Sequence, residues 1–227
     1  MKILLVAATV QEVQPLVSAL SSHTCTEGLG IFNYKENEIH VLVTGVGVMQ
    51  TGYYLGKAFA ENEYTQALQI GIAGAFDRKI SLEEVVLVST EKIADLGAED
   101  GVALLSVEEM QLQQPDQYPY KNGWLENDLL IMSHALNDLK KVRSVTVNKV
   151  LGNQSSIDVI RKKYSPDIIN MEGAAFFYAC LMNRIPFLEM RSISNYAEPR
   201  DKSRWKMESA IENLTTEAYK YLQAVLK

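Results

Sequence analysis

Cysteine and histidine are scarce in this chain of 227 residues, which contains two cysteines and three histidines. Cys25 and Cys180 are too few for a disulfide framework, and their spacing is not that of a zinc site. No histidine has a second histidine at ligand spacing, so the sequence predicts no metal site. We therefore expect a protein of a reducing compartment, the cytoplasm, that uses no metal and no other cofactor.

Long apolar runs and an excess of positive charge are also missing. Residues 1–10 are mostly apolar, but Gln11 and Glu12 end the run before it reaches the length of a signal peptide or a spanning helix. The chain has 22 Lys and Arg against 28 Asp and Glu, a net charge of −6. The charge argues against nucleic acid and membrane surfaces as partners, and a small molecule is the expected partner.

Strand-like and helical segments alternate along the chain. Residues 2–8 and 81–90 have the apolar character of buried strands, and residues 187–194 form another strand-like run. Residues 174–182 and 204–226 have helical spacing. The order of these segments predicts an α/β fold, a single three-layer domain over residues 1–227 with a central mixed sheet flanked by helices.

The segments between these elements are assigned by the same reasoning. An acidic stretch at residues 91–101 predicts a solvated loop. Residues 106–124 are polar, with two prolines and two tyrosines, and a loop of this length is a candidate lid over a pocket. We expect helices at residues 127–137 and 155–164, with a strand at residues 143–151 between them.

Two glycine-rich segments follow apolar strands. T-G-V-G-V at residues 44–48 leads into a helical stretch, and G-I-A-G-A at residues 71–75 closes a short strand at residues 67–70. Glycine at a strand end lets the backbone pass close to a ligand, and a helix start binds anions. Both segments lack the third glycine of a dinucleotide fingerprint and the Lys-Ser/Thr pair of a phosphate-binding loop.

Three polar side chains stand at the ends of predicted strands or at the start of a predicted helix. Glu12 follows the first strand, Glu172 precedes an apolar helix, and Asn195 comes at the end of a strand. Ligands of open α/β sheets are held at such positions. Glu12 would equally complete a capping box with Thr9, which is the simpler interpretation of the sequence alone.

Four separated features together resemble the nucleoside phosphorylase and nucleosidase family, which includes methylthioadenosine/S-adenosylhomocysteine nucleosidase. They are Glu12, T-G-V-G-V at residues 44–48, I-G-I-A-G-A at residues 70–75, and N-M-E-G-A-A followed by R-S-I-S-N. The resemblance covers nearly the whole chain in the right order. It implies a purine nucleoside bound in a cleft at the strand ends and a homo-oligomer, a dimer or higher.

The same resemblance implies roles for individual residues. Glu12 matches the carboxylate that activates the attacking water, and Glu172, with Met171 beside it, matches the residue that binds the ribose hydroxyls. The glycine segments match loops that pass near the ribose and the attacking group; the glycines concerned are Gly45, Gly47 and Gly74.

Asn195 departs from the pattern of the adenine-releasing nucleosidases, which place an aspartic acid at this position. An amide gives up no proton at neutral pH, but its NH₂ group donates hydrogen bonds. Adenine presents an exocyclic amino donor there, whereas a 6-oxopurine presents two acceptors. The sequence therefore predicts a 6-oxopurine leaving group that Asn195 stabilises.

No arginine precedes Arg78, so neither glycine segment supplies the cation that a phosphorylase needs for phosphate, and water is the expected nucleophile. S-N-Y-A-E-P-R-D-K-S-R-W at residues 194–205 resembles the futalosine hydrolase family, whose usual S-N-x-V-G-x-R-D is altered here without a change in spacing. The resemblance implies hydrolysis of futalosine to hypoxanthine and dehypoxanthine futalosine, in menaquinone biosynthesis. Futalosine carries a carboxylate beyond the ribose 5′ carbon, and Arg200, Lys202 and Arg204 are candidates to bind it, although a solvated cluster before the last helix would look the same.

Three alternatives stay open at this point. One is a methylthioadenosine/S-adenosylhomocysteine nucleosidase, and another is a purine nucleosidase or phosphorylase that acts on a nucleoside such as inosine. The third is a nucleoside-binding protein without catalysis, against which the presence of both Glu12 and Glu172 argues.

Overall fold

The computed structural model describes residues 1–227 apart from 102, 129–130, 132 and 227. Its helices and strands in chain order are β1 (Lys2–Ala7), α1 (Val10–Leu20), β2 (Gly28–Tyr34), β3 (Asn37–Val43), α2 (Val48–Glu61), β4 (Gln66–Ala75), β5 (Val85–Glu91), β6 (Gly97–Asp100), β7 (Ala103–Ser106), β8 (Tyr120–Lys121), β9 (Trp124–Glu126), η1 (His134–Leu136), β10 (Lys140–Thr146), α3 (Gln154–Tyr164), β11 (Ile168–Asn170), α4 (Gly173–Asn183), β12 (Phe187–Tyr196), η2 (Lys202–Arg204) and α5 (Met207–Val225).

Ten strands form one mixed sheet, and five of them close on themselves. β4 pairs with β12, β12 with β5, β5 with β10, β10 with β11, and β11 again with β4. β1, β3 and β2 extend the sheet beyond β4, and β9 and β8 extend it beyond β5. The five paired strands therefore form a small closed barrel. β1 and β3 are parallel, and α1 lies between β1 and β2 in the chain.

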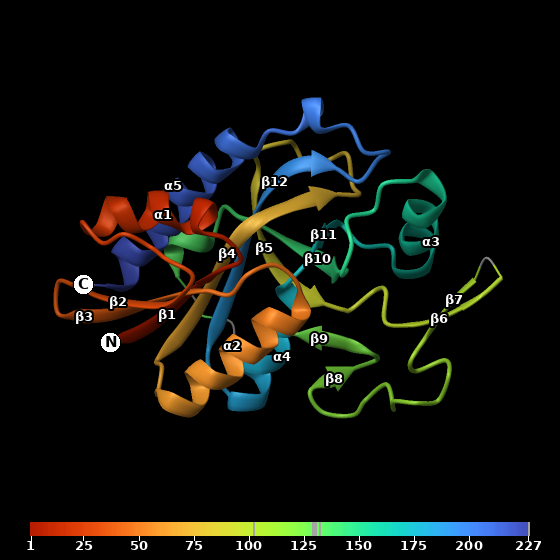
Figure 1. Ribbon diagram of the computed structural model, residues 1–227, viewed down its shortest axis with the longest axis horizontal. Coiled ribbons are helices and arrows are strands. Elements are labelled where there is room, and N and C mark those ends of the chain that lie inside the picture. The colour runs from red at the N-terminus through yellow and green to blue at the C-terminus, as the bar shows by residue number, and fades with distance from the viewer. Residues whose placement is uncertain (102, 129–130, 132, 227) are drawn as a thin grey trace.

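Helices cover the sheet on both faces. α1 and α5 lie together on one side, α2 and α4 on the other, and α3 stands at the end of the molecule near β10 and β11 (Figure 1). Each side has its own apolar core, because the strand residues alternate between the two faces. The predicted three-layer α/β architecture is confirmed.

The individual elements follow from their sequences. The residues of β1 after Lys2 are fully buried, as a continuous apolar strand requires. α4 buries Phe176, Phe177 and Cys180 against β12 and neighbouring strands, and Arg184 closes it in the left-handed conformation. Of the helices among the described residues, none combines the length and the apolar character needed to cross a bilayer.

Several predicted boundaries are wrong. Residues 91–101 are not wholly a loop, because β6 pairs with β7 in a hairpin that turns at Gly101. The strand at residues 67–70 continues to Ala75, since β12 pairs with it along its whole length. The strand expected at residues 143–151 is displaced to Lys140–Thr146.

The helix expected at residues 127–137 is also wrong. Within the described part of this segment, only His134–Leu136 is helical, as a single 3₁₀ turn. Asn127 instead continues the line of β9, because its backbone N–H donates to Ser89 O at 3.0 Å. Tertiary pairing with β5 has here overridden local helical spacing. Positions 129–130 and 132 of the prediction lie outside the described residues.

Candidate active site

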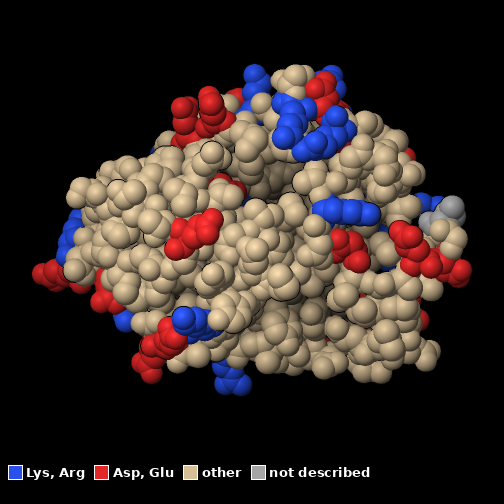
Figure 2. Space-filling view, in the orientation of Figure 1, with Lys and Arg blue, Asp and Glu red and all other residues tan. Residues whose placement is uncertain are grey.

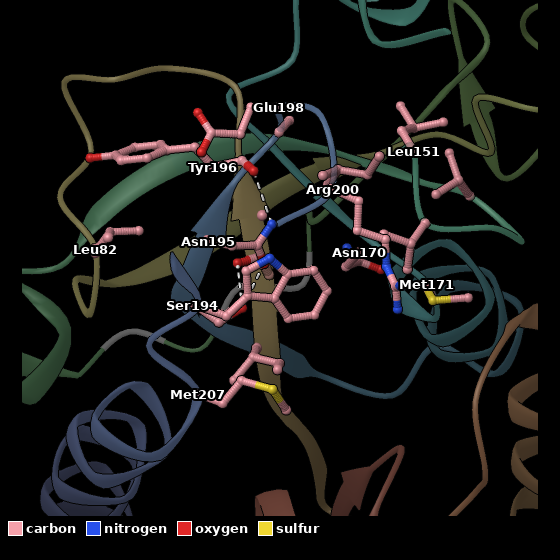
Figure 3. A pocket seen from close by; sticks show the side chains of 18 of the residues that line it. Leu82, Leu151, Asn170, Met171, Ser194, Asn195, Tyr196, Glu198, Arg200 and Met207 are labelled. Atoms are coloured by element: carbon pink, nitrogen blue, oxygen red, sulfur yellow. Dashed lines mark hydrogen bonds between the residues drawn. The ribbon is translucent and has the colours of Figure 1, made fainter. Parts of the chain in front are cut away.

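A cavity of about 490 Å³ opens at the ends of β1, β4, β11 and β12. This is the size of a typical small-molecule site. Seven of the predicted residues line it, and Lys202 does not: Glu12, Gly74, Met171, Glu172, Asn195, Arg200 and Arg204. In Figure 3, Met171 and Asn170 lie to one side of Asn195, and Tyr196 and Leu82 lie to the other. The structure therefore brings together residues that are far apart in the sequence.

Glu12 serves as a helix cap and as a cavity residue at once. Its Oε2 accepts from Thr9 N at 3.0 Å and from Thr9 Oγ1 at 2.8 Å, which completes the predicted capping box. Its Oε1 accepts from Ile72 N at 3.1 Å. A carboxylate offers about four acceptor positions, so these three donors leave one free, on Oε1. The predicted capping box is confirmed, and its bonds hold the carboxylate at the cavity wall.

Gly71 makes room for this arrangement. A Cβ atom at Gly71 would stand 2.3 Å from Arg191 Nη1 and 3.0 Å from Glu12 Oε1. Any side chain there would displace the guanidinium and the carboxylate together, and both are held by other bonds. The glycine at position 71 thus allows the close approach of two groups of the protein itself.

Glu172 stands immediately before α4, with its carboxylate between a backbone donor and a cation. Gly47 N donates to Glu172 Oε1 at 3.0 Å, and Arg191 Nη1 lies 3.6 Å from Glu172 Oε2. Burial, more than any neighbour, raises the pKa of Glu172 above its ordinary value, and Arg191 and the Gly47 N–H oppose that rise. Gly47 has a φ of 95°, which favours glycine and aims its N–H at the carboxylate.

Asn195 reaches the cavity because β12 is irregular at its end. The register of β12 against β4 shifts between Ile193 and Asn195, a bulge that redirects the side chain. Asn195 Nδ2 donates to Tyr196 O at 3.0 Å, and Ser194 Oγ donates to Asn195 Oδ1 at 2.9 Å (Figure 3). A carbonyl oxygen only accepts, so the NH₂ group faces Tyr196 and keeps its second hydrogen for a ligand.

The mouth of the cavity is lined by arginines that are not equivalent. Glu198 accepts from both Arg78 and Arg204, and Arg78 also stacks over the Tyr196 ring at 4.3 Å. Arg200 makes no ion pair with any described residue and lies 5.9 Å from the Trp205 ring. In Figure 2, Lys and Arg gather beside one acidic group over the segment after β12, at the upper edge of a hollow. Arg200 is therefore the cation of this rim that stays available to a ligand.

Sequence reasoning missed the groups that hold the site in place. Arg191 and Asn170 belong to the motifs R-S-I-S-N and N-M-E-G-A-A, but the sequence predicts no role for either. The backbone N–H of Ile72 cannot be recognised from residue type. Arg191 is buried, with its Nε donating to Glu189 Oε1 at 2.6 Å. Burial alone would lower the pKa of Arg191, but Glu189 and Glu172 raise it above its ordinary value. A cation and an anion two residues apart on a buried strand, Glu189 and Arg191, were the signal that the sequence offered.

Gly45, Gly47 and the candidate lid lie outside the cavity lining. Gly45 and Gly47 do not line the cavity, because the turn presents Val46 to it and uses the Gly47 N–H for Glu172. None of residues 106–124 lines it either. Instead, Tyr118 Oη donates to Leu181 O and Tyr120 contacts Tyr178, so this loop packs against α4.

No group of three or more His, Cys, Asp or Glu in the described part of the chain is arranged around a possible metal ion.

Comparison with known proteins agrees with this geometry. The family model for the phosphorylase superfamily matches residues 2–227. The chain belongs to this superfamily. A futalosine hydrolase from Thermus thermophilus is 33% identical over 76% of each chain. A 5'-methylthioadenosine/S-adenosylhomocysteine nucleosidase from Maridesulfovibrio salexigens is 25% identical over 100% of this chain and 99% of its own.

Solved structures of the superfamily show the same fold. A futalosine hydrolase mutant from Helicobacter pylori superposes with a TM-score of 0.79 at 16% identity, covering 98% of this chain and 99% of the other. The predicted fold and the predicted resemblance are both confirmed.

Proposed function

We propose that this chain hydrolyses the N-glycosidic bond of a 6-oxopurine nucleoside, and that its substrate is futalosine. The observation that carries the proposal is the amide of Asn195, held with one N–H free in the same cavity as Glu12 and Glu172. The products are hypoxanthine and dehypoxanthine futalosine, a step of menaquinone biosynthesis. The domain as a whole, residues 1–227, is the catalytic unit.

The two cavity carboxylates serve the sugar. Cleavage of the glycosidic bond develops positive charge on the ribose ring. Glu12 takes a proton from the attacking water through the free acceptor position of Oε1. Glu172 accepts hydrogen bonds from the ribose hydroxyls, and Met171 packs against the sugar.

The amide serves the base. The departing 6-oxopurine gains negative charge, which its oxygen carries, and the free N–H of Asn195 donates to that oxygen. Tyr196 O fixes the direction of the donor before the substrate arrives. A donor aimed in advance at a developing charge contributes about 10²–10³-fold to the rate.

The surroundings of Glu12 favour water over phosphate as the nucleophile. Arg191 is the cation nearest to Glu12 and Glu172, and it is already paired with Glu189. A phosphate dianion placed there would meet two carboxylates and no free arginine, whereas phosphorylases hold it with arginine. Water carries no such charge.

Three observations support futalosine within this class. The relative with 33% identity is a futalosine hydrolase. The rim after β12 holds Arg200 unpaired, in position for the substrate carboxylate. The remaining lining next to it is mostly apolar, with Trp205, Met207 and Ile211, which suits the ring that carries the carboxylate.

Product analysis by chromatography tests the proposal. Futalosine, inosine and methylthioadenosine are offered in parallel, with and without phosphate. We expect hypoxanthine from futalosine at the highest kcat/KM, without a phosphate requirement. Adenine from methylthioadenosine as the main product would refute it, and ribose 1-phosphate formation would refute the role of water.

The second candidate is a methylthioadenosine/S-adenosylhomocysteine nucleosidase, because a relative with this name spans the full chain. Asn195→Asp separates the two candidates. An acid at this position donates and accepts, so we expect the variant to lose activity on futalosine and to gain activity on methylthioadenosine. An unchanged preference would remove Asn195 from base recognition.

We also propose that the chain forms a homo-oligomer through α2 and α4 and acts in the cytoplasm. Four large side chains on these two adjacent helices are exposed: Met49, Tyr53, Tyr178 and Met182. Contiguous exposed apolar surface of this kind is typical of a protein interface. Light scattering of wild type and Met49→Lys/Tyr53→Lys tests the contact, with a lower mass expected for the variant.

A further inference from the structure

A second group of acidic and polar side chains lies beneath the cavity, inside the barrel formed by β4, β12, β5, β10 and β11, and reaches the cavity wall at Asn170. Glu91 ends β5, Asn170 ends β11, and Glu189 lies in β12; all three are buried. The hydroxyls of Ser144 and Thr146 reach them from β10. None of the functions assigned above uses Glu91.

Asn170 connects this group with the ribose-binding carboxylate. Its Oδ1 accepts from Glu172 N at 2.9 Å and from Gly173 N at 2.7 Å, so its side chain caps the start of α4. Its Nδ2 donates to Glu91 Oε1 and to Ser144 Oγ at 2.8 Å. Glu91 and Ser144, with Glu189 Oε1 at 3.4 Å, therefore set the direction of the Asn170 amide and with it the backbone that carries Glu172.

Thr146 cannot serve all of its neighbours if Glu91 is charged. Thr146 Oγ1 lies 2.8 Å from Glu91 Oε2 and 3.2 Å from Asn170 Oδ1, and it accepts from Ala174 N at 2.8 Å. A hydroxyl has one proton, and both of the first two atoms are acceptors when Glu91 is ionised. If Glu91 carries a proton, it donates to Thr146, and Thr146 donates to Asn170. Both short contacts of the Thr146 hydroxyl are then hydrogen bonds.

Charge leads to the same result. The charged group that acts on Glu91 is Glu189 on β12, and the other ionisable groups of the neighbouring elements are Arg191 on β12, Glu172 before α4 and Cys180 within α4. β10 and β11 contribute only hydroxyls and an amide, and Lys92 Nζ is turned away to Glu108 and Gly123 O. Arg191 contacts Glu189 and Glu172 and lies near Glu12, and no cation among the described residues forms an ion pair with Glu91.

We propose that Glu91 is a positioning residue for the ribose-binding carboxylate and that it acts in its neutral form, donating to Thr146 so that Thr146 and Asn170 hold the backbone of Glu172. The inference rests on the proposed nucleoside hydrolysis and adds a residue outside the cavity. Burial first, and then the charge of Glu189, raise the pKa of Glu91 to about 8, so the acid keeps its proton at neutral pH.

Three variants test this role. Glu91→Gln keeps a neutral group that donates to Thr146 and accepts from Asn170, and we expect kcat/KM within about threefold of wild type at neutral pH. Glu91→Met keeps the length but removes both bonds, and we expect kcat/KM to fall about tenfold or more, with a raised KM, because Glu172 loses its support. Glu108→Gln, which breaks the largely buried ion pair between Glu108 and Lys92, is the matched control.

The pH profile distinguishes positioning by a neutral acid from simple packing. Wild-type kcat/KM should fall as the pH rises through about 8, where Glu91 ionises, and the Glu108→Gln control should fall in the same way. Glu91→Gln has no proton to lose there and should retain activity further into the alkaline range. Equal damage from Gln and Met, or an alkaline fall that Gln leaves in place, would overturn the proposal.

Two measurements need no substrate and keep this inference separate from the proposed function. Infrared difference spectra of wild type minus Glu91→Gln should contain the carbonyl band of a protonated carboxylic acid at neutral pH. The folded pKa of Glu91 lies above its ordinary 4.5, so its contribution to stability is complete below pH 4.5 and is lost as the pH rises to about 8. Wild-type Tm should fall relative to Glu91→Gln across that window.

These results also decide the case in which the wild-type protein hydrolyses no nucleoside. The proposed function would then fail, and the infrared band would still establish or exclude the neutral acid. A purine nucleoside bound about tenfold more weakly by Glu91→Met than by Glu91→Gln in calorimetry would establish the positioning role, and equal affinity would exclude it.

Discussion

Two pairs of glutamates share one guanidinium, and their surroundings give them different chemistry. Glu12 and Glu172 line the cavity, whereas Glu91 and Glu189 are sealed inside the barrel. Arg191 lies between the pairs, 2.6 Å from Glu189 and 3.6 Å from Glu172. The cavity pair accepts mainly from backbone N–H groups, and the sealed pair accepts from side chains.

This difference decides which pair can act on a ligand. Backbone donors at strand ends are fixed by the sheet, so Glu12 keeps an acceptor position for water without losing its place. The sealed pair uses its capacity on Asn170, Thr146 and Arg191. We therefore propose that the same residue type serves catalysis in one place and support in the other, according to burial and partners.

The largest effect is expected from Glu12→Gln, which changes the cavity pair alone. The amide cannot accept the proton of the attacking water, so we expect kcat to fall about 10³-fold. The fold should persist, because Thr9 N still finds an acceptor oxygen. Steady-state kinetics beside a thermal melt makes the measurement. A variant with more than a tenth of wild-type kcat would mean that Glu12 is not the base.

Arg191→Met removes the cation that both pairs share. Glu189 and Glu172 would be left buried without their partner, and breaking a buried pair in this way costs about 3–5 kcal/mol. Urea unfolding measures the loss, and the reference is Lys220→Met, which breaks an ion pair at the surface of α5. A cost below about 1 kcal/mol, as for a surface pair, would contradict the assignment of Arg191 as a shared partner.

Gly173→Ala acts on the sealed pair from the side of α4. A Cβ atom there would stand 2.2 Å from Glu91 Oε1 and 2.7 Å from Glu189 Oε1. Overpacking of this kind costs about 1–3 kcal/mol, although alanine favours a helix more than glycine does. Gly52→Ala in α2, where nothing lies within 4 Å, is the matched control and should be neutral or stabilising. Equal melting temperatures for the two variants would contradict the close packing at Gly173.

Thr9→Ala gives the smallest effect and separates the two roles of Glu12. It removes the hydroxyl that donates to Oε2 at 2.8 Å and leaves Thr9 N and Ile72 N in place. We expect a loss of about 1 kcal/mol in stability, as for other caps. Activity should fall less than tenfold, because the remaining donors still hold the carboxylate. A loss as large as that of Glu12→Gln would show that the hydroxyl itself takes part in the reaction.

The sequence predicts the cavity pair well and the sealed pair not at all, for a physical reason. Glu12, Glu172 and Asn195 stand at strand ends or a helix start, and such positions are visible as polar residues that interrupt apolar runs. Glu91 also ends a strand, but acidic residues follow it in the sequence. The whole stretch is therefore predicted to be a solvated loop, and the burial of Glu91 cannot be recognised. The wrong helix at residues 127–137 has the same origin, since pairing with a distant strand leaves no local trace.

Glycine segments show the same limit. Their presence at strand ends predicts that other groups approach the backbone closely, and this is found at Gly71 and Gly74. A Cβ atom at Gly74 would stand 3.2 Å from Asn195 Nδ2. Which partner approaches could not be predicted. At Gly47 the partner is a glutamate of the protein itself, because the positive φ turns the N–H toward Glu172.

The closed circuit of five strands also sets an order of events during synthesis. β12 is made last of the five, yet it lies between β4 and β5 and pairs Phe187 with Ala67 across most of the chain. Contacts between such distant segments form late, because the long loop between them must first be closed. Until β12 enters, Asn195 is absent from the cavity and Arg191 is absent from between the glutamates. The cavity with both of these residues is therefore complete only when the barrel closes.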